Sequence, residues 1–266
     1  MTQTITMRDR CAAQSVIEEL LREHALTPPR SPLARFLGFS PLGAASVSRY
    51  LGARGEIAVA AVLAELPAGW EVFHAVPVGD RGSDIDHVVI GPGGVIAITT
   101  KHHPGEYIWV GGSTFMVSGH KEAYLHSAIS GAERVTTLIR SRVPLLEAAR
   151  PVIALVDPKQ ITIRYRPEHV AVLDARDLRR WLIDLPEVLS DADAHQVAAL
   201  LDDPAFWGIA DPRPPDELMR QFAALDAEVQ AARTRRVDWA LIAGALLVVG
   251  VCAAAPFLLG FLMAAL

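Results

Sequence analysis

The sequence predicts a mixed α/β domain, with a sheet flanked by helices, followed by a C-terminal transmembrane helix. Between residues 46 and 201, segments with helical spacing alternate with period-two or β-branched segments, which is typical of an α/β domain. Residues 239–266 contain no Asp, Glu, Lys or Arg, and 24 of these 28 residues are hydrophobic. The remainder has an ordinary apolar content, which excludes a disordered chain and a polytopic membrane protein.

Charge and cysteine content narrow the class of protein further. The chain of 266 residues carries 25 Lys and Arg against 30 Asp and Glu, a net charge of −5. This balance gives no overall basic field and argues against strong non-specific binding of nucleic acid. Two isolated cysteines exclude a disulfide framework and fit a reducing compartment. The bases are 22 Arg and only 3 Lys, which suggests a GC-rich bacterial genome.

Composition shifts divide the chain into four parts. A short amphipathic helix over residues 11–25 is broken by a Pro-rich stretch, so the first part looks like a loosely attached leader. A second Pro-rich stretch separates the central domain from another amphipathic segment. The predicted parts are a leader at 1–44, a domain at 45–210, a linker with a juxtamembrane helix at 211–237, and a transmembrane helix at 238–266.

Within the domain, a helix over 46–66 precedes a series of strands and a long helix over 124–149. A solid apolar run at 151–156 has the pattern of a strand covered on both faces. Helix, antiparallel hairpins, long helix and buried strand together predict one mixed sheet sandwiched by helices. The predicted strands are 71–76, 83–90, 95–101, 107–110, 114–117, 151–156, 161–165 and 169–173, and two last helices cover 175–185 and 191–201.

The C-terminal segment fixes a predicted location. Twenty-eight uncharged residues suffice for one membrane span, and Pro256 is expected to kink it. Arg233, Arg235 and Arg236 precede the span, so the positive-inside rule places the N-terminal domain in the cytoplasm of a single-pass protein in the cell membrane. An apolar stripe on the preceding helix, residues 216–236, is open to three uses: pairing with a partner helix, packing on the domain, or lying on the bilayer.

The most informative stretch is the hairpin over residues 83–101. If Gly91-Pro-Gly-Gly94 forms its turn, Ile90 pairs with Val95. Asp86 then lies opposite Thr99, and Asp84 lies opposite Lys101, all on one side of the sheet. Two carboxylates and one ammonium gather at the open end of an apolar hairpin. Such a set suits metal-assisted phosphodiester cleavage, although a surface Asp–Lys pair gives the same pattern.

Longer strings in this region resemble a known family. Gly55-Glu56, then Asp-Ile-Asp-His-Val-Val-Ile-Gly-Pro-Gly-Gly-Val, then Thr-Lys-His-His-Pro-Gly are similar to the nuclease-related domain, NERD, over about residues 52–173. That family is placed with the PD-(D/E)xK nuclease-like folds. The resemblance implies a restriction-endonuclease-like core and a divalent-metal site for Mg²⁺ or Mn²⁺. It also implies Glu56 as the helical acid, Asp86 as the central metal ligand and Lys101 as the catalytic lysine. The hairpin pattern adds Asp84 as a further candidate metal ligand.

One departure from the family pattern divides the functional hypotheses. Thr99 stands where the family has the acid two residues before the lysine, and a neutral hydroxyl is a poorer ligand for Mg²⁺. The first hypothesis is a membrane-anchored, metal-dependent nuclease acting on DNA or RNA, with Thr99 and His102 contacting the substrate. The second is a catalytically degenerate nuclease fold that binds nucleic acid or protein at the membrane. A plain scaffold acting through residues 216–236 is the third.

Other polar residues have weaker claims. His102 and His103 point to opposite faces of a strand, so joint chelation is disfavoured, and His87 is expected on the far side of the hairpin. A basic rim for a nucleic-acid backbone or a solvated helix face explains several cations equally. These cations are His120, Lys121, Arg134, Arg140 and Arg142. The polar group that such nucleases often carry on the next helix has no definite match among His126, Ser127 and Ser130.

Overall fold

The computed structural model describes residues 6–77, 84–144, 146–207 and 215–264, without the side chains of residues 205, 252, 253 and 256–264. Seven α-helices and nine strands lie in these ranges. The helices are α1 Gln14–Ala25, α2 Pro32–Phe36, α3 Ala44–Leu63, α4 Tyr124–Arg140, α5 Leu178–Ile183, α6 Asp191–Leu201 and α7 Pro215–Ala264. The strands are β1 Glu71–Pro77, β2 Asp84–Gly91, β3 Gly94–His102, β4 Tyr107–Gly111, β5 Thr114–Val117, β6 His120–Glu122, β7 Arg150–Val156, β8 Gln160–Tyr165 and β9 Ala171–Asp174.

The predicted mixed α/β class is confirmed, but the strands form two sheets where one was predicted. The first has the order β1-β2-β3-β7-β9, and the second has the order β6-β5-β4-β8. β3 pairs antiparallel with β2 and parallel with β7, so both of its edges are occupied. The strands β4, β5, β6 and β8 build the separate second sheet, in which β4 pairs parallel with β8.

The register of the central hairpin agrees with the prediction. Ile90 pairs with Val95, and Gly91 pairs with Gly94, which has a φ of +99° that favours glycine. The ladder extends to His87 and Ile98. The predicted oppositions of Asp86 with Thr99 and of Asp84 with Lys101 lie beyond the paired positions, where β2 and β3 part.

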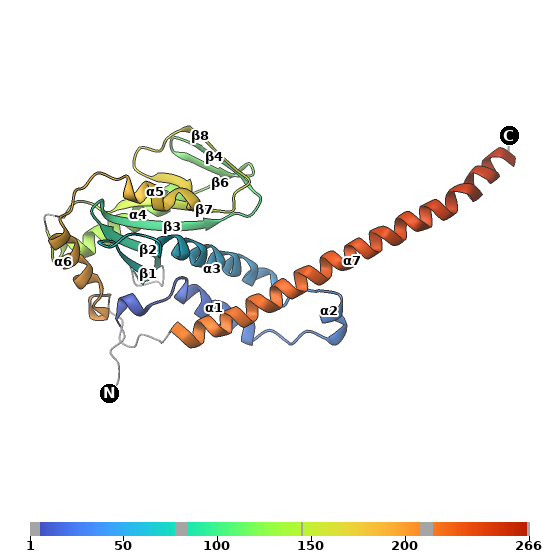
Figure 1. Cartoon of the computed structure of the whole chain (residues 1–266), viewed down its shortest axis with the longest axis horizontal. Helices are drawn as coiled ribbons and strands as arrows, with labels where there is room; N and C mark the ends of the chain where they lie inside the picture. The colour runs from blue at the N-terminus through green and yellow to red at the C-terminus, as the bar shows by residue number, and fades with distance from the viewer. Residues whose placement is uncertain (1–5, 78–83, 145, 208–214, 265–266) are drawn as a thin grey trace.

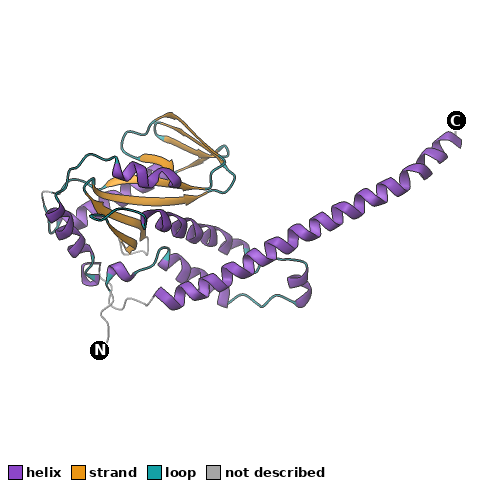
Figure 2. Cartoon of the chain, viewed as in Figure 1, coloured by secondary structure: helices purple, strands orange, loops and turns teal. Residues whose placement is uncertain are grey.

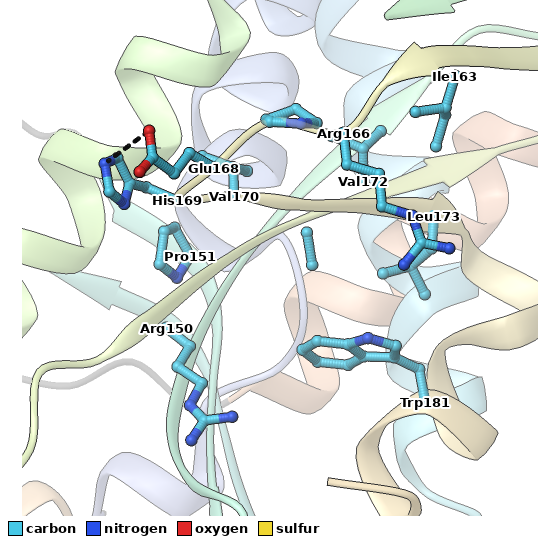
Figure 3. Close-up of a pocket in the computed structure, with 12 residues that line it drawn as sticks. Arg150, Pro151, Ile163, Arg166, Glu168, His169, Val170, Val172, Leu173 and Trp181 are labelled. Atoms are coloured by element: carbon cyan, nitrogen blue, oxygen red, sulfur yellow. Dashed lines mark ion pairs between the residues drawn. The ribbon is translucent and has the colours of Figure 1, made fainter. Parts of the chain in front are cut away.

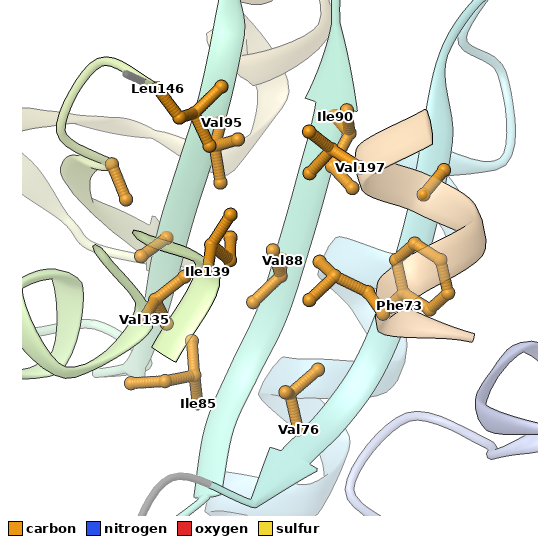
Figure 4. Close-up of a cluster of buried hydrophobic side chains, with 14 of the residues drawn as sticks. Phe73, Val76, Ile85, Val88, Ile90, Val95, Val135, Ile139, Leu146 and Val197 are labelled. Atoms are coloured by element: carbon orange, nitrogen blue, oxygen red, sulfur yellow. The ribbon is translucent and has the colours of Figure 1, made fainter. Parts of the chain in front are cut away.

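Helices cover both faces of the first sheet (Figure 2). On one face, α3 and α5 pack on apolar side chains of β2, β3 and β7, among them Val89, Ile96 and Ile98. On the other face, α4 and α6 pack on Val88 and Ile90 in a second core cluster (Figure 4). Burial of each such side chain stabilises the fold by roughly 1.5–3 kcal/mol, so the two cores fix the hairpin between them.

The long helix α4 ends at Arg140, nine residues before the predicted end at 149. Pro144 explains the difference, because proline lacks the amide donor and disfavours helical backbone in the residue before it. The Arg140 side chain then binds the turn, with Nε donating to the carbonyl of Leu146 at 2.9 Å.

The N-terminal segment is not the loosely attached leader that was predicted. Ile17 and Leu20 of α1 are fully buried, in a cluster with Tyr50 of α3 and with Phe222 and Leu225 of α7. The stripe on residues 216–236 is thus used within the chain, which decides among its three predicted uses in favour of packing on the domain.

One helix, α7, contains both the predicted juxtamembrane helix and most of the predicted span (Figure 1). Its C-terminal half extends away from the rest of the chain, with Leu241, Leu246 and Leu247 exposed. Among the described residues, no helix has the length and apolar character needed to cross a membrane, so the structure lends the predicted anchor no support. Residues 252, 253 and 256–264 of the predicted span have no described side chains, and 265–266 lie outside the described residues.

A buried histidine pair links β1 to β2 and makes stability sensitive to acid. The Nδ1 atoms of His74 and His87 lie 2.8 Å apart, and burial lowers the pKa of His74 to about 4. Burial lowers the pKa of His87 well below its usual range, and the charge of His74 lowers it further. A depressed histidine pKa gives stability that is present above about pH 6.5 and is lost as pH falls towards 4, because the unfolded chain takes up protons that the folded chain refuses.

We expect His74 alone to lower the free energy of unfolding by roughly 1–2 kcal/mol between pH 7 and pH 5. The His74→Gln variant should lose less stability over this interval than the wild type. Urea denaturation at both pH values measures the difference, and equal losses in the two proteins would contradict it.

Candidate metal and nucleic-acid site

All the predicted site residues except His102 line two hollows near the start of β2 and the end of β3. The larger hollow, about 790 Å³, lies against α4 and is lined by Asp86, Thr99 and Lys101. The smaller, about 130 Å³, lies against α1 and α3 and is lined by Glu56 together with Asp84 and Asp86. Because both aspartates line both hollows, the separation of β2 from β3 brings the helical acid and the hairpin acids to one place.

Glu56 is a buried acid on α3, with 6% of its surface exposed. Burial raises its pKa well above the usual range, and the nearby carboxylates of Asp86 and Asp84 raise it further. A backbone hydrogen bond from Ala13 and the charge of Lys101 act in the opposite direction. Burial among like charges is the condition in which a carboxylate site gains most from a cation.

Asp86 stands at the point where the hairpin opens. Its Oδ2 accepts a hydrogen bond from the backbone amide of Thr100 at 2.5 Å. Burial raises its pKa to about 6, although the charge of Lys101 and the Thr100 amide lower it. Asp86 is therefore held in position by the backbone of β3, and burial outweighs the charge of Lys101 in setting the direction of its pKa.

Lys101 extends from β3 to the side of α4. Its Nζ lies 4.6 Å from the ring centroid of Tyr124, a distance typical of a cation–π contact. Lys101 shares the larger hollow with Asp86 and also lowers the pKa of both Asp86 and Glu56. The structure thus brings the predicted lysine and the two predicted acids into one electrostatic group.

Thr99 is half-buried and lines the larger hollow beside Asp86 and Lys101. Thr99 therefore lies at the site, where the family has an acid, but its hydroxyl carries no charge. His126, Ser127 and Ser130 of α4 line the same hollow, so all three candidates for the polar group of the next helix are present.

His102 lies elsewhere, which does not agree with its predicted contact with substrate. Its Nδ1 donates to the carbonyl of Leu51 at 2.8 Å, and its Nε2 lies 3.2 Å from Oδ2 of Asp157. The side chain is 5% exposed and packs on α3, where a Cβ at Gly55 would come within 2.8 Å of the His102 Cβ. His102 fastens α3 to β3, because alternation along the strand turns it away from Lys101.

Of the remaining candidate residues, some line the larger hollow and others do not. Arg134 lines the larger hollow. Lys121, Arg140 and Arg142 are not among its lining residues, so the predicted basic rim reduces to Arg134. His103 stacks on Tyr124 at 5.7 Å between ring centroids.

The structure adds two residues that the sequence did not indicate. Ser15 of α1 donates a hydrogen bond to Oδ2 of Asp84, and Nη2 of Arg10 lies 3.5 Å from the same oxygen. Burial raises the pKa of Asp84, and these two contacts lower it. These two contacts join residues about seventy positions apart in the sequence. A single sequence contains no pattern that would predict such contacts.

The donor set fits one hard divalent cation held by two carboxylates. Across the described part of the chain, no three His, Cys, Asp or Glu side chains are grouped to hold a metal ion. Asp84 is engaged by Ser15 and Arg10, and Glu19, which lines the smaller hollow, is paired with Arg49. Glu133 of α4 lines the larger hollow only, so Glu56 and Asp86 are the candidate oxygen donors. Mg²⁺ is bound in many proteins by one or two carboxylates, with waters completing its shell, so two acids are sufficient.

A separate hollow of about 530 Å³ lies near the start of β7, lined by Arg150, Arg166 and Trp181 among others (Figure 3). In the parallel register, Arg150 pairs with Ile96, five residues before Lys101. At about 3.3 Å per residue, the two places lie roughly 16 Å apart along the strand. This hollow contains no pair of acids and is not part of the candidate site.

Comparison with known proteins identifies the central segment. Residues 51–156 match the nuclease-related domain, NERD. The NERD match covers less than half of the chain, yet it contains Glu56, both hairpin aspartates, Thr99 and Lys101. It leaves out α1 and α7, so the contacts of Arg10 and Ser15 with Asp84 come from outside the NERD segment. No curated protein and no solved structure matches the chain.

Proposed function

We propose that the NERD segment is a Mg²⁺- or Mn²⁺-dependent nuclease that hydrolyses phosphodiester bonds of DNA or RNA. The observation that carries this proposal is the group of Glu56, Asp86 and Lys101 around adjoining hollows at the open end of the hairpin. Perturbed carboxylates beside a lysine in a cleft are typical of functional sites.

Each residue has a role that its position supports. Glu56 and Asp86 would hold the cation, which when bound activates a water molecule and offsets negative charge on the phosphate. The ammonium group of Lys101 stabilises the charge that develops on the phosphoryl oxygens. The larger hollow is wide enough for a phosphate and its neighbouring groups, and Thr99 and Ser130 offer hydroxyls to it.

We assign the first sheet to a restriction-endonuclease-like core. The order of elements within this sheet supports the assignment. The helix α3 is followed by the antiparallel strands β1, β2 and β3, and after β4–β6 of the second sheet come α4 and β7, which is parallel to β3.

The proposal is tested by incubating the full chain with plasmid DNA or with single-stranded RNA, in Mg²⁺, in Mn²⁺ and in EDTA. We expect cleavage that requires metal and is lost in the Asp86→Asn variant. The exposed Asp184→Asn variant is the matched control and should retain full activity. Equal cleavage by wild type and Asp86→Asn would refute the assignment of the site.

Thr99 favours a second candidate, a degenerate nuclease fold that binds nucleic acid or protein without cleaving it. The neutral hydroxyl occupies the place of a metal-binding acid in the same hollow as Asp86. The Thr99→Glu variant separates the two functions. Cleavage that appears only in this variant would favour the binding module, whereas strong cleavage by the wild type would exclude it.

We also propose that α7 attaches the chain to the cell membrane, with the NERD segment on the cytoplasmic side. The uncharged residues 239–266 and the arginines before them support this proposal. After extraction of membranes with alkaline carbonate, the full chain should stay in the pellet, while a chain ending at residue 236 should not. Release of the full chain into the supernatant would argue against attachment.

A further inference from the structure

The connection between α1 and α3 exposes an unusual number of large apolar side chains. Five large hydrophobic residues are at least 38% exposed there, and most face solvent with more than half of their surface. They are Leu26, Leu33, Phe36, Leu37 and Phe39, and we refer to them as the apolar loop. Contiguous exposed groups of this size mark interaction surfaces on proteins.

The apolar loop packs against α7. The indole Nε1 of Trp239 donates to the carbonyl of Phe36 at 2.9 Å, and the two rings meet edge to face at 4.9 Å. Gly38, with a φ of +75°, lies so close to α7 that a Cβ would come within 2.7 Å of the Ala232 carbonyl oxygen. The loop is therefore held beside the part of α7 where exposed apolar residues begin.

The charge around the apolar loop is mainly positive. No Asp or Glu occurs between Glu23 and Glu56. No hydrogen bond or ion pair engages the guanidinium groups of Arg35 and Arg236 within the described structure, and Arg235 donates only to the carbonyl of Arg35. Among nearby acids, Glu228 is paired with Arg30 at 2.7 Å, which leaves Asp238 as the one acid beside these arginines on α7.

We propose that the apolar loop, with Trp239 and the flanking arginines, docks on the surface of a bilayer that contains anionic phospholipid. Apolar side chains that are rimmed by arginine insert at the boundary between headgroups and acyl chains. Tryptophan is enriched at this level, and each arginine near the surface is attracted to anionic headgroups. The inference extends the proposed membrane attachment and fixes which face of the domain meets the lipid.

The continuity of the surface favours lipid over a protein partner. Next to Phe36 and the half-buried Trp239, exposed apolar residues continue along α7, among them Leu241 and Leu246. A bilayer accommodates both the loop and this length of helix, with the arginines at headgroup level.

The experiment places an environment-sensitive fluorophore at Leu33→Cys in the full chain, with Cys11 and Cys252 replaced by serine. The chain is reconstituted in vesicles of neutral phosphatidylcholine, or of phosphatidylcholine with phosphatidylglycerol. Companion labels at Val248→Cys on α7 and at Tyr165→Cys on the remote β8 report the helix and the far surface. We expect blue-shifted emission and protection from iodide at positions 33 and 248, and full quenching at position 165.

Lipid protection at 248 with a water-exposed 33 would overturn the inference while leaving membrane attachment intact. Water exposure at both positions would overturn both proposals. Anionic lipid should increase the binding reported by the label at position 33. The Arg35→Gln and Arg236→Gln variants should each reduce this increase about fivefold. Equal insertion of position 33 in neutral and anionic vesicles would overturn the lipid assignment, as would protection by native membranes but not by pure lipid.

Discussion

Replacing Lys101 by methionine is expected to reduce metal-dependent cleavage by roughly 100- to 1,000-fold, the usual loss when one group that stabilises developing charge is removed. Lys101 is the one lysine that lines the hollow of Asp86 and Thr99. Methionine keeps a long apolar stem and a sulfur that packs well on the ring of Tyr124, so the fold should persist. Initial rates of plasmid cleavage under single-turnover conditions measure the effect.

Lys121→Met is the matched control, because Lys121 is exposed on β6 and does not line the hollow. It should cleave within about twofold of the wild type, since isolated surface substitutions change little. If Lys101→Met and Lys121→Met cleave at the same rate, Lys101 has no catalytic role.

Replacing Phe222 by alanine should lower the free energy of unfolding by about 3–5 kcal/mol. Its ring is 5% exposed and lies 6.1 Å from the ring of Tyr50, in the cluster that binds α7 to α1 and α3. The cavity left behind cannot close without moving one of three helices. Urea denaturation of the full-length wild type and variant, both in one detergent, measures the change.

Phe39→Ala is its control, because Phe39 is 56% exposed and should change the free energy of unfolding by less than about 0.5 kcal/mol. Equal effects of the two substitutions would show that α7 does not depend on this cluster. A loosened α7 should also loosen α1, and with it the contacts of Ser15 and Arg10 with Asp84.

Sequence periodicity was sufficient for the hairpin and for the identity of most elements. The Gly-Pro-Gly-Gly turn fixed the pairing of Ile90 with Val95, because the position and length of the turn set the register of a hairpin. The predicted end of α4 was wrong because the helical spacing of apolar residues continues past Pro144. Proline disrupts helical backbone, and this effect outweighs the spacing.

Contacts between residues far apart in the sequence could not be predicted from the sequence alone. β4 pairs with β8, a strand about fifty residues away in the sequence, and no local pattern reveals this pairing. The same limit applies at the site. Glu56, Asp86 and Lys101 were predicted as a set, whereas the contacts of Ser15 with Asp84 and of His102 with α3 depend on how distant helices pack.

We propose that the acids Glu56 and Asp86 hold a divalent cation. Electron paramagnetic resonance of free Mn²⁺ during titration of the full chain tests it directly. We predict one bound Mn²⁺ for the wild type and for Asp184→Asn, with at least about tenfold weaker binding in Glu56→Gln and in Asp86→Asn. Wild-type affinity in the Glu56→Gln variant would contradict the claim.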